Sequence, residues 1–303
     1  MAYAFIAVMA IWLGGDAIYW KVTDNRWKRW ESGVARDAEG VRIGCRDFTM
    51  GDGDVALLMI HGFADSPATF RRMAPRLAAE GFTCRAMRLP GFAEPMDRYR
   101  RSTREQWRAT VRRELETLRE SHRQVFVVAH SLGGAIAADV LMDQPNLADG
   151  VVMLAPLIGV SNRRSPILPA EAWYSFVDPL LAFSKTFQMA FPVHYEDQAL
   201  GDEVLRDEFV PRNIYRAMFQ TMRRVRGEAR RFGHPVLMVL SSDDKIVDAE
   251  KAQTFLDACG STDKQMRFAE HAKHVLTLDT GWEETSSWIS HFVHERSVIA
   301  PGG

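Results

Sequence analysis

The chain has 303 residues, of which 47% are hydrophobic and 25% are charged, so it carries ample apolar side chains for the core of a globular protein. Its formal net charge of -1 gives no electrostatic footprint for nucleic acid and favours a neutral or locally recognised ligand. The three cysteines, Cys45, Cys84 and Cys259, are far apart and lack metal-ligand spacing, which argues against a disulfide framework and a clustered metal site.

An apolar segment opens the chain. Residues 2–13 are continuously apolar, and after Gly14, Gly15 and Asp16 the sequence returns to Ala-Ile-Tyr-Trp. Roughly 18 residues with one acid near the end could just cross a bilayer. The basic residues that follow would then keep the rest of the chain on the cytoplasmic side. We therefore expect residues 1–30 to act as a membrane anchor. The alternatives are a helix packed on the domain of a soluble cytoplasmic protein, or on a partner, and a cleaved signal peptide.

From Val41 onward, strand patterns alternate with helical patterns. In chain order we expect strands at 42–50, 55–60, 83–87, 125–129, 150–155, 236–240 and 266–268, and helices at 66–81, 103–118, 135–143, 249–258 and 282–294. The Gly51-Asp52-Gly53 run between the first two strands is typical of a hairpin turn. Ser66-Pro67 is typical of a helix N-cap followed by proline. This alternation predicts an α/β fold, with a mainly parallel central sheet and helices on both faces.

The alternation stops at Pro156 and resumes at Pro235. The segment in between has few β-branched runs and carries aromatic residues at helical spacing, namely Trp173, Tyr174, Phe176, Phe183, Phe187, Phe191, Tyr215 and Phe219. We expect residues 159–233 to form a helical cap, inserted between two parts of an α/β core at 31–158 and 234–303. Such a cap over a crevice would line an apolar pocket.

The strongest single motif lies in the run from Val125 to Gly134, which reads V-F-V-V-A-H-S-L-G-G. A buried strand is followed by a sharp turn at Ser131 and the start of a helix. Small residues on both sides of a serine in this context are the pattern of a nucleophile elbow, G-x-S-x-G, in which they let neighbouring backbones approach a strained turn. Ala129 replaces the first glycine and adds one methyl group, which weakens the match without breaking it.

A serine nucleophile needs a base to take its proton and an acid to orient that base. An acid, Asp243 or Asp244, follows the strand at 236–240, and a histidine, His271 or His274, follows the strand near Phe268. Because the carboxyl ends of parallel strands meet at one edge of a sheet, these groups can converge with Ser131 despite their distance in sequence. The order serine, acid, histidine is the order of α/β-hydrolases.

With these motifs the chain resembles the α/β-hydrolase superfamily, and most closely its monoacylglycerol lipase, lysophospholipase and carboxylesterase group, over about Val41 to Glu295. The resemblance implies Ser131 as nucleophile and His274, followed by Val275-Leu276, as base. It implies Asp244 as the acid in preference to Asp243, because Asp244-Lys245-Ile246-Val247 matches the group's D-x-x-V.

The run from Leu57 to Phe63, L-L-M-I-H-G-F, resembles the oxyanion loop of the same group. It implies that the backbone N–H groups of Phe63 and Leu132 hold the oxyanion, while the ring of His61 makes structural hydrogen bonds. The chain departs from the group's P-G-H-G, which here is Pro90-Gly91-Phe92-Ala93.

The implied function is hydrolysis of carboxylic esters with an apolar acyl group through an acyl-enzyme, without a metal or organic cofactor. Expected partners are a small ester or lipid substrate and, through the N-terminal segment, a membrane. One alternative keeps the three groups but cleaves another bond, as in a proline iminopeptidase or a carbon-carbon hydrolase. Acids of the cap could serve that reaction, namely Glu196, Asp197, Asp202 and Glu203. The other alternative is a catalytically silent binding protein of the same fold.

Overall fold

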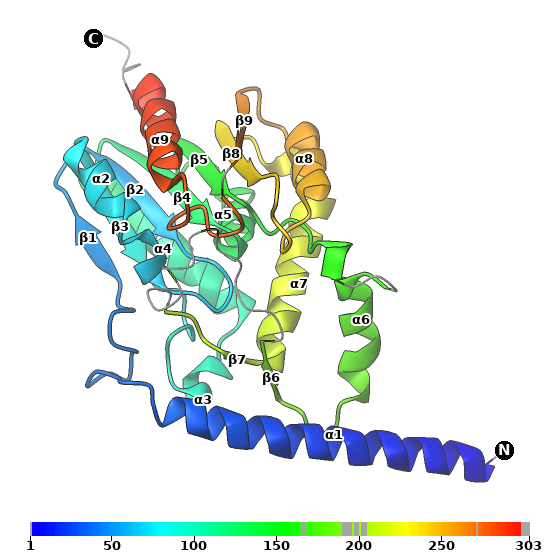
Figure 1. Ribbon diagram of the computed structural model, residues 1–303. Coiled ribbons are helices and arrows are strands. Elements are labelled where there is room, and N and C mark those ends of the chain that lie inside the picture. The colour runs from blue at the N-terminus through cyan, green and yellow to red at the C-terminus, as the bar shows by residue number, and fades with distance from the viewer. Residues whose placement is uncertain are drawn as a thin grey trace.

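The computed structural model describes residues 2–164, 168–189, 196, 200, 205–270 and 272–297 of the chain. Within them a seven-stranded sheet has the order β1-β3-β2-β4-β5-β8-β9, and β1 alone runs antiparallel to its neighbour (Figure 1). The strands are β1 (Phe48–Met50), β2 (Val55–Ile60), β3 (Phe82–Met87), β4 (Gln124–His130), β5 (Gly150–Leu154), β8 (Val236–Ser241) and β9 (Lys264–Ala269). The predicted α/β fold with a mainly parallel sheet is confirmed.

Helices cover both faces of this sheet, as the alternating pattern predicted. α2 packs against α9 on one face and α4 packs against α5 on the other (Figure 1). The α-helices are α1 (Ala2–Glu31), α2 (Met73–Ala79), α3 (Met96–Tyr99), α4 (Arg104–Ser121), α5 (Leu132–Leu141), α6 (Ala170–Val177), α7 (Arg212–Gly227), α8 (Ala249–Ala258) and α9 (Trp282–Ser297). Short 3-10 helices occupy Pro67–Phe70, Asn162–Arg164, Asp178–Leu180 and Ala229–Arg231.

Two local expectations were wrong. The hairpin expected around Gly51-Asp52-Gly53 does not form, because β1 pairs with β3 and not with β2. The glycines instead let the chain pass close to the start of β3, since a Cβ on Gly51 would lie 2.1 Å from the carbonyl oxygen of Phe82. The single helix expected at 66–81 is a 3-10 turn followed by α2, and the side chain of Ser66 makes no capping hydrogen bond.

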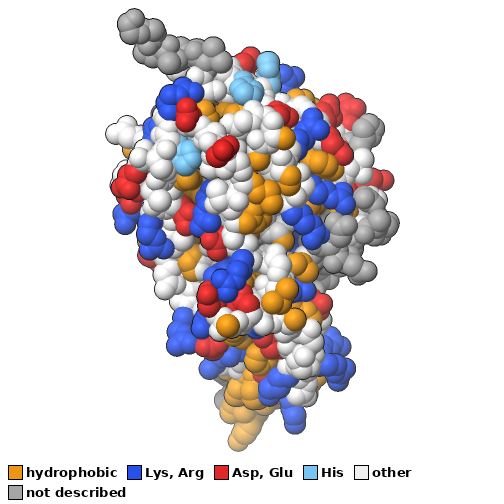
Figure 2. Space-filling model, turned by 90° about the vertical axis from the view of Figure 1, so that its left-hand side faces the viewer, with side chains coloured by type: hydrophobic (Ala, Val, Ile, Leu, Met, Phe, Trp, Pro, Cys, Tyr) orange, Lys and Arg blue, Asp and Glu red, His pale blue; other side chains and the backbone are white. Residues whose placement is uncertain are grey.

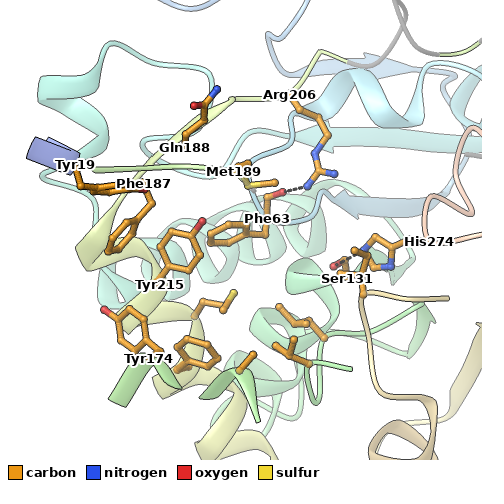
Figure 3. A pocket seen from close by; sticks show the side chains of 16 residues that line it. Tyr19, Phe63, Ser131, Tyr174, Phe187, Gln188, Met189, Arg206, Tyr215 and His274 are labelled. Atoms are coloured by element: carbon orange, nitrogen blue, oxygen red, sulfur yellow. Dashed lines mark hydrogen bonds between the residues drawn. The ribbon is translucent and has the colours of Figure 1, made fainter. Parts of the chain in front are cut away.

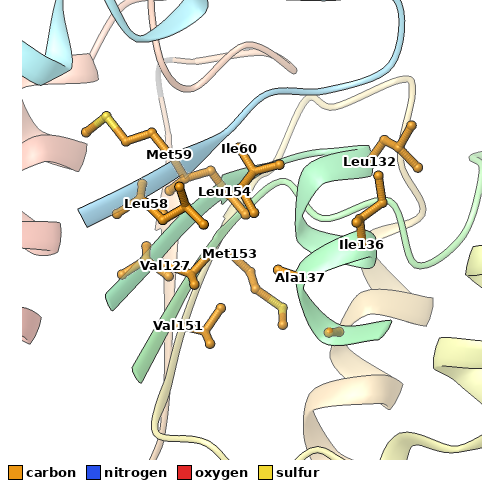
Figure 4. Close-up of a cluster of buried hydrophobic side chains, with 14 of the residues drawn as sticks. Leu58, Met59, Ile60, Val127, Leu132, Ile136, Ala137, Val151, Met153 and Leu154 are labelled. Carbon is orange, nitrogen blue, oxygen red and sulfur yellow. The ribbon is translucent and has the colours of Figure 1, made fainter. Parts of the chain in front are cut away.

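Part of the hydrophobic core lies between the sheet and α5. Figure 4 shows the side chains that gather there from β2, β4, β5 and α5, among them Leu58, Val127, Met153, Ile136 and Ala137, all fully buried. Burying a large apolar side chain stabilises the fold by about 1.5–3 kcal/mol. This packing fixes α5 on β4 and thereby fixes the turn between them, which contains Ser131.

The segment between β5 and β8 contains more than helices. Besides α6 and α7 it holds a two-stranded antiparallel sheet of β6 (Thr186–Gln188) and β7 (Phe209–Pro211), so the expectation of helical spacing throughout was wrong. Several of the aromatic residues expected in the cap cluster there, with the ring of Tyr215 stacked on Tyr174 and meeting Phe187 edge to face. Phe191 lies outside the described residues.

The long N-terminal helix α1 passes under this segment, and its N-terminal end extends beyond it (Figure 1). Asp16, the acid in the apolar run, is buried and accepts hydrogen bonds from the backbone N–H groups of Ala182, Phe183 and Ser184 at 2.7, 2.8 and 3.2 Å. Burial opposes its ionisation, but these hydrogen bonds together lower the pKa of Asp16. The acid therefore anchors α1 as a carboxylate.

A packed N-terminal helix was one of the expected alternatives, and the contacts of Asp16 match it. No helix within the described residues, α1 included, combines the length and apolarity needed to cross a membrane. The prediction of a membrane-spanning segment near the N-terminus was therefore wrong.

Candidate active site

Ser131 occupies the sharp turn between β4 and α5. Its φ of 52° and ψ of -117° lie in a region that residues with side chains rarely adopt. Gly133 makes the turn sterically feasible, because a Cβ at this position would lie 2.3 Å from the carbonyl oxygen of Ile60 in β2. Ala129 is fully buried in β4, so the extra methyl group at the first small position of the motif is accommodated. The strand, turn and helix expected for the elbow are all present.

Three side chains from distant parts of the sequence meet at this turn. His274 Nε2 lies 3.1 Å from Ser131 Oγ, and His274 Nδ1 lies 2.7 Å from Asp244 Oδ2. All three residues are at least 95% buried, which removes competing water from these hydrogen bonds. The arrangement can move a proton from the hydroxyl to the imidazole while the carboxylate holds the ring in place.

Asp244 is held as a carboxylate. Burial alone would raise its pKa, but the neighbouring His274 and the backbone N–H groups of Ile246 and Val247, which donate to Oδ1 at 2.7 and 3.1 Å, lower the pKa of Asp244. Asp243, the alternative acid, is about half exposed and lies near Lys245 instead. His271, the alternative histidine, lies outside the described residues.

Two other histidines near the site have structural hydrogen bonds. The Nδ1–H of His61 donates to the carbonyl of Gly62 at 2.9 Å, and its Nε2 accepts from the backbone N–H of Leu89 at 3.0 Å. His130 donates from Nε2 to the carbonyl oxygen of His274 at 2.9 Å and so supports the loop that carries that residue. Burial lowers the pKa of His61 and of His130 to about 3, so both rings are neutral near pH 7.

The two expected oxyanion donors lie close to Ser131, because Leu132 follows it in the chain and a Cβ on Gly62, the residue before Phe63, would lie 3.1 Å from Ser131 Cβ. Phe63 follows β2, and Leu132 is the first residue of α5, where backbone N–H groups lack partners within the helix. In the part of the chain that the structure describes, the N–H groups of Phe63 and Leu132 donate to no acceptor. They are therefore available to a ligand that approaches the hydroxyl of Ser131.

One residue at the site was not predicted from the sequence. Arg206 donates from Nη2 to the carbonyl oxygen of Phe63 at 2.5 Å and so fixes the peptide that follows the expected oxyanion donor. It also lines the cavity in front of Ser131. It belongs to no motif, and only its place within the proposed cap could have pointed to it.

A cavity of about 420 Å³ leads away from Ser131, a volume within the range of small-molecule sites. Figure 3 shows Ser131 and His274 at one end of it and Tyr19 and Phe187 at the other. Its walls are mainly apolar and come from the core, from α6 and α7 and from α1; they include Leu157, Val160, Met189, Met218, Phe219 and Ile246. No carboxylate lines this cavity among the residues that the structure describes.

Of the four acids proposed for another bond, the structure describes Glu196, which does not line the cavity. Glu196 has a side chain 56% exposed and pairs with Lys273 at 3.0 Å. Asp197, Asp202 and Glu203 lie outside the described residues. Likewise, no group of three or more histidine, cysteine or acidic side chains within the described ranges could hold a metal ion.

Two bacterial proteins are similar to this chain in sequence. The chain is 27% identical over 236 residues to a carboxylesterase of Bacillus subtilis (strain 168), which covers 77% of this chain and 90% of the relative. It is 23% identical over 246 residues to a thermostable monoacylglycerol lipase of Bacillus sp. (strain H-257), covering 79% and 90%.

Solved structures give the same architecture. A monoacylglycerol lipase of Paleococcus ferrophilus superposes with a TM-score of 0.71 at 20% identity, covering 82% of this chain and 98% of that one. A structure described under the metagenome-derived lipolytic enzymes LipS and LipT superposes with a TM-score of 0.74 at 21% identity, covering 84% and 99%. Residues 52–281, most of the chain, match the family described as serine aminopeptidase, S33. The chain therefore belongs to the serine aminopeptidase S33 family of α/β-hydrolases.

Proposed function

We propose that the chain is a serine hydrolase that cleaves carboxylic esters with an apolar acyl group through an acyl-enzyme. The observation that carries the proposal is the contact of Ser131 with His274, and of His274 with Asp244, at the end of an apolar cavity. Ester hydrolysis is also supported by relatives named carboxylesterase and monoacylglycerol lipase.

In the proposed reaction Ser131 Oγ attacks the ester carbonyl while His274 takes its proton, and His274 then returns that proton to the leaving alcohol. Asp244 orients the ring and stabilises its charged form. Negative charge develops on the carbonyl oxygen, where the N–H groups of Phe63 and Leu132 stabilise it; loss of one such donor typically lowers kcat by ~10² to 10³. Water then hydrolyses the acyl-enzyme by the same steps.

The substrate we propose is a monoacylglycerol, a lysophospholipid or a simple ester with an apolar chain. The apolar walls of the cavity favour the acyl chain. Release of an N-terminal residue from a peptide would require an acid to hold the ammonium group, and no carboxylate lines the cavity within the described ranges. Residues 159–233 would act as the cap over this cavity, between core segments 31–158 and 234–303.

We also propose that α1 brings the enzyme to a lipid surface without crossing it. Side chains such as Tyr3, Ile6 and Ile18 are exposed on this helix, and apolar side chains gather at the lower end of the molecule, where α1 lies, with Lys and Arg beside them (Figure 2). An apolar helix with adjoining basic residues suits the interface of an anionic membrane. Sedimentation with lipid vesicles measures this association.

The proposed reaction is tested by rates on nitrophenyl esters of increasing chain length. Ser131→Ala should lower kcat by several orders of magnitude, on the ~10⁶ scale found when the nucleophile of subtilisin is removed. Ser286→Ala is the matched control, because Ser286 is equally buried but lies in α9, where its hydroxyl bonds the carbonyl of Trp282. Retention of most turnover by Ser131→Ala would rule out the proposed nucleophile.

A further inference from the structure

The N-terminal helix contributes to the cavity of the proposed active site. Tyr19 of α1 lines the end farthest from Ser131, together with Phe187 of β6, and the two ring centroids are 6.3 Å apart (Figure 3). α1 lies before residue 52, where the family match begins. One wall of the cavity is therefore supplied by a part of this chain that the family pattern does not include.

A second cavity of about 510 Å³ lies beyond this ring pair and shares Tyr19 and Phe187 with the first. We call it the α1 groove. It runs between α1 and the end of α6, and its apolar walls include Val8, Ile11, Trp12, Gly15, Val177 and Leu181.

The carboxylate and the indole N–H in the α1 groove already have partners. The carboxylate of Asp16 accepts three backbone N–H groups, and the indole N–H of Trp12 donates to the carbonyl of Leu180 at 3.0 Å. Apart from the hydroxyl of Tyr19, what remains for a ligand is mainly apolar surface, so the α1 groove suits a hydrocarbon chain better than a charged group.

α1 is fixed on both sides of Tyr19. Asp16 binds the backbone of the 182–184 segment, and Arg26 donates from Nη1 to the side-chain oxygen of Gln188 in β6 at 3.1 Å. The helix therefore holds Tyr19 against Phe187 and acts as a fixed wall for both cavities.

We propose that the α1 groove is a distal acyl subsite and that α1 sets the chain-length preference of the enzyme. This inference rests on the proposed ester hydrolysis. A short acyl chain bound at Ser131 ends within the first cavity, whereas a long chain continues past Tyr19 and Phe187 into the groove. Each methylene buried there strengthens binding roughly fourfold, so occupancy of the groove favours long-chain esters.

The test compares kcat/KM for nitrophenyl butyrate, octanoate, dodecanoate and hexadecanoate. In Gly15→Leu the new side chain enters the groove, and no atom lies within 4 Å of the position its Cβ would take. Because the side chain displaces several methylenes of a long chain, hexadecanoate turnover should fall by about tenfold or more while butyrate turnover stays unchanged.

Gly14→Leu is the matched control. It makes the same substitution one residue earlier, with equally open space around Cβ, at a position that does not line the groove, and it should leave the profile unchanged. Tyr19→Ala removes one of the two rings that line both the first cavity and the α1 groove. It should therefore raise the ratio of hexadecanoate to butyrate turnover.

Two results would overturn the inference: a chain-length profile for Gly15→Leu that matches that of Gly14→Leu, or an equal loss on all four esters. Either would leave the proposed function standing, provided that wild-type turnover still depends on Ser131. Absence of ester hydrolysis in the wild-type protein would instead remove the proposed function.

Discussion

The backbone of Ser131 is strained, and its neighbours hold it in that conformation. A positive φ at a residue other than glycine costs on the order of 1–3 kcal/mol. The N–H of Ser131 donates to the carbonyl of Leu154 at 2.9 Å, and its carbonyl accepts from the N–H of Leu157 at 2.9 Å. These hydrogen bonds tie the turn to β5 and to the loop after it. Together with the close approach at Gly133, they offset the strain and direct the hydroxyl toward His274.

A buried carboxyl beside the site should make stability depend on pH. Asp207 accepts the N–H of Ala93 at 3.0 Å, and burial raises the pKa of Asp207 from 3.8 to about 7. The folded protein therefore holds this proton more tightly than the unfolded chain does. The resulting stability is fully present below pH 3.8 and is lost as the pH rises through about 7.

Asp207→Asn keeps an oxygen for the N–H of Ala93 but cannot ionise. Its free energy of unfolding in urea should therefore rise relative to that of wild type between pH 3.8 and about 7. Asp52→Asn, in an exposed loop, is the control and should show no such trend. A constant difference between Asp207→Asn and wild type across this range would contradict the assignment.

At the scale of elements, α1 combines two kinds of surface. The face around Asp16 and Tyr19 is joined to the segment between β5 and β8, whereas Tyr3 and Ile6, nearer the N-terminus, are exposed. The exposed basic residues Lys21 and Arg29 follow on the same helix. A helix fixed to the protein at one end and apolar at the other can rest on a lipid surface.

Vesicle binding tests this role of α1. Tyr3→Asp combined with Ile6→Asp should sharply reduce the fraction of protein that sediments with phosphatidylglycerol vesicles, because each change places a charge in the apolar interface. Ile43→Asp removes an exposed apolar side chain outside α1 and is the matched control. Equal sedimentation of the double variant and the control would count against contact through α1.

Elements with a local signal could be predicted from the sequence. The buried strands are continuous apolar runs, and the start of α4 carries a capping box at Thr103 and Gln106. The pairing of β1 with β3 could not be predicted, because Gly51-Asp52-Gly53 is typical of a hairpin turn. The close approach of Gly51 to Phe82, which accompanies the observed pairing, joins residues that are remote in sequence. The β6 and β7 strands are three residues each, too short to show a period.

The same distinction applies to the site. Ser131, Asp244 and His274 each follow a strand, so the convergence of a serine, an acid and a histidine could be predicted from topology. The choice of Asp244 over Asp243 and of His274 over His271 came from the resemblance to the family. Arg206 and Tyr19 could not be found in this way. Each reaches the cavity from an element without a motif, and its place depends on how α1 and the segment between β5 and β8 fold over the sheet.

At the scale of the whole molecule, three parts of the chain meet at one cavity. The carboxyl ends of the strands present Ser131 and His274, the segment between β5 and β8 supplies most of the apolar wall, and α1 lines the far end with Tyr19 (Figure 3). An ion-pair cluster fixes the second part on the first, since Arg224 of α7 pairs with Asp139 and Asp143 at α5. The cavity therefore depends on the packing of all three parts.

We propose that Ser131 is an activated nucleophile at the end of this cavity. A fluorophosphonate probe, with the modified peptide located by mass spectrometry, measures this most directly. We predict one adduct on Ser131 of the full chain, much slower labelling of His274→Ala, and no adduct on Ser131→Ala. An adduct on a different serine, or equally fast labelling of His274→Ala, would contradict the account.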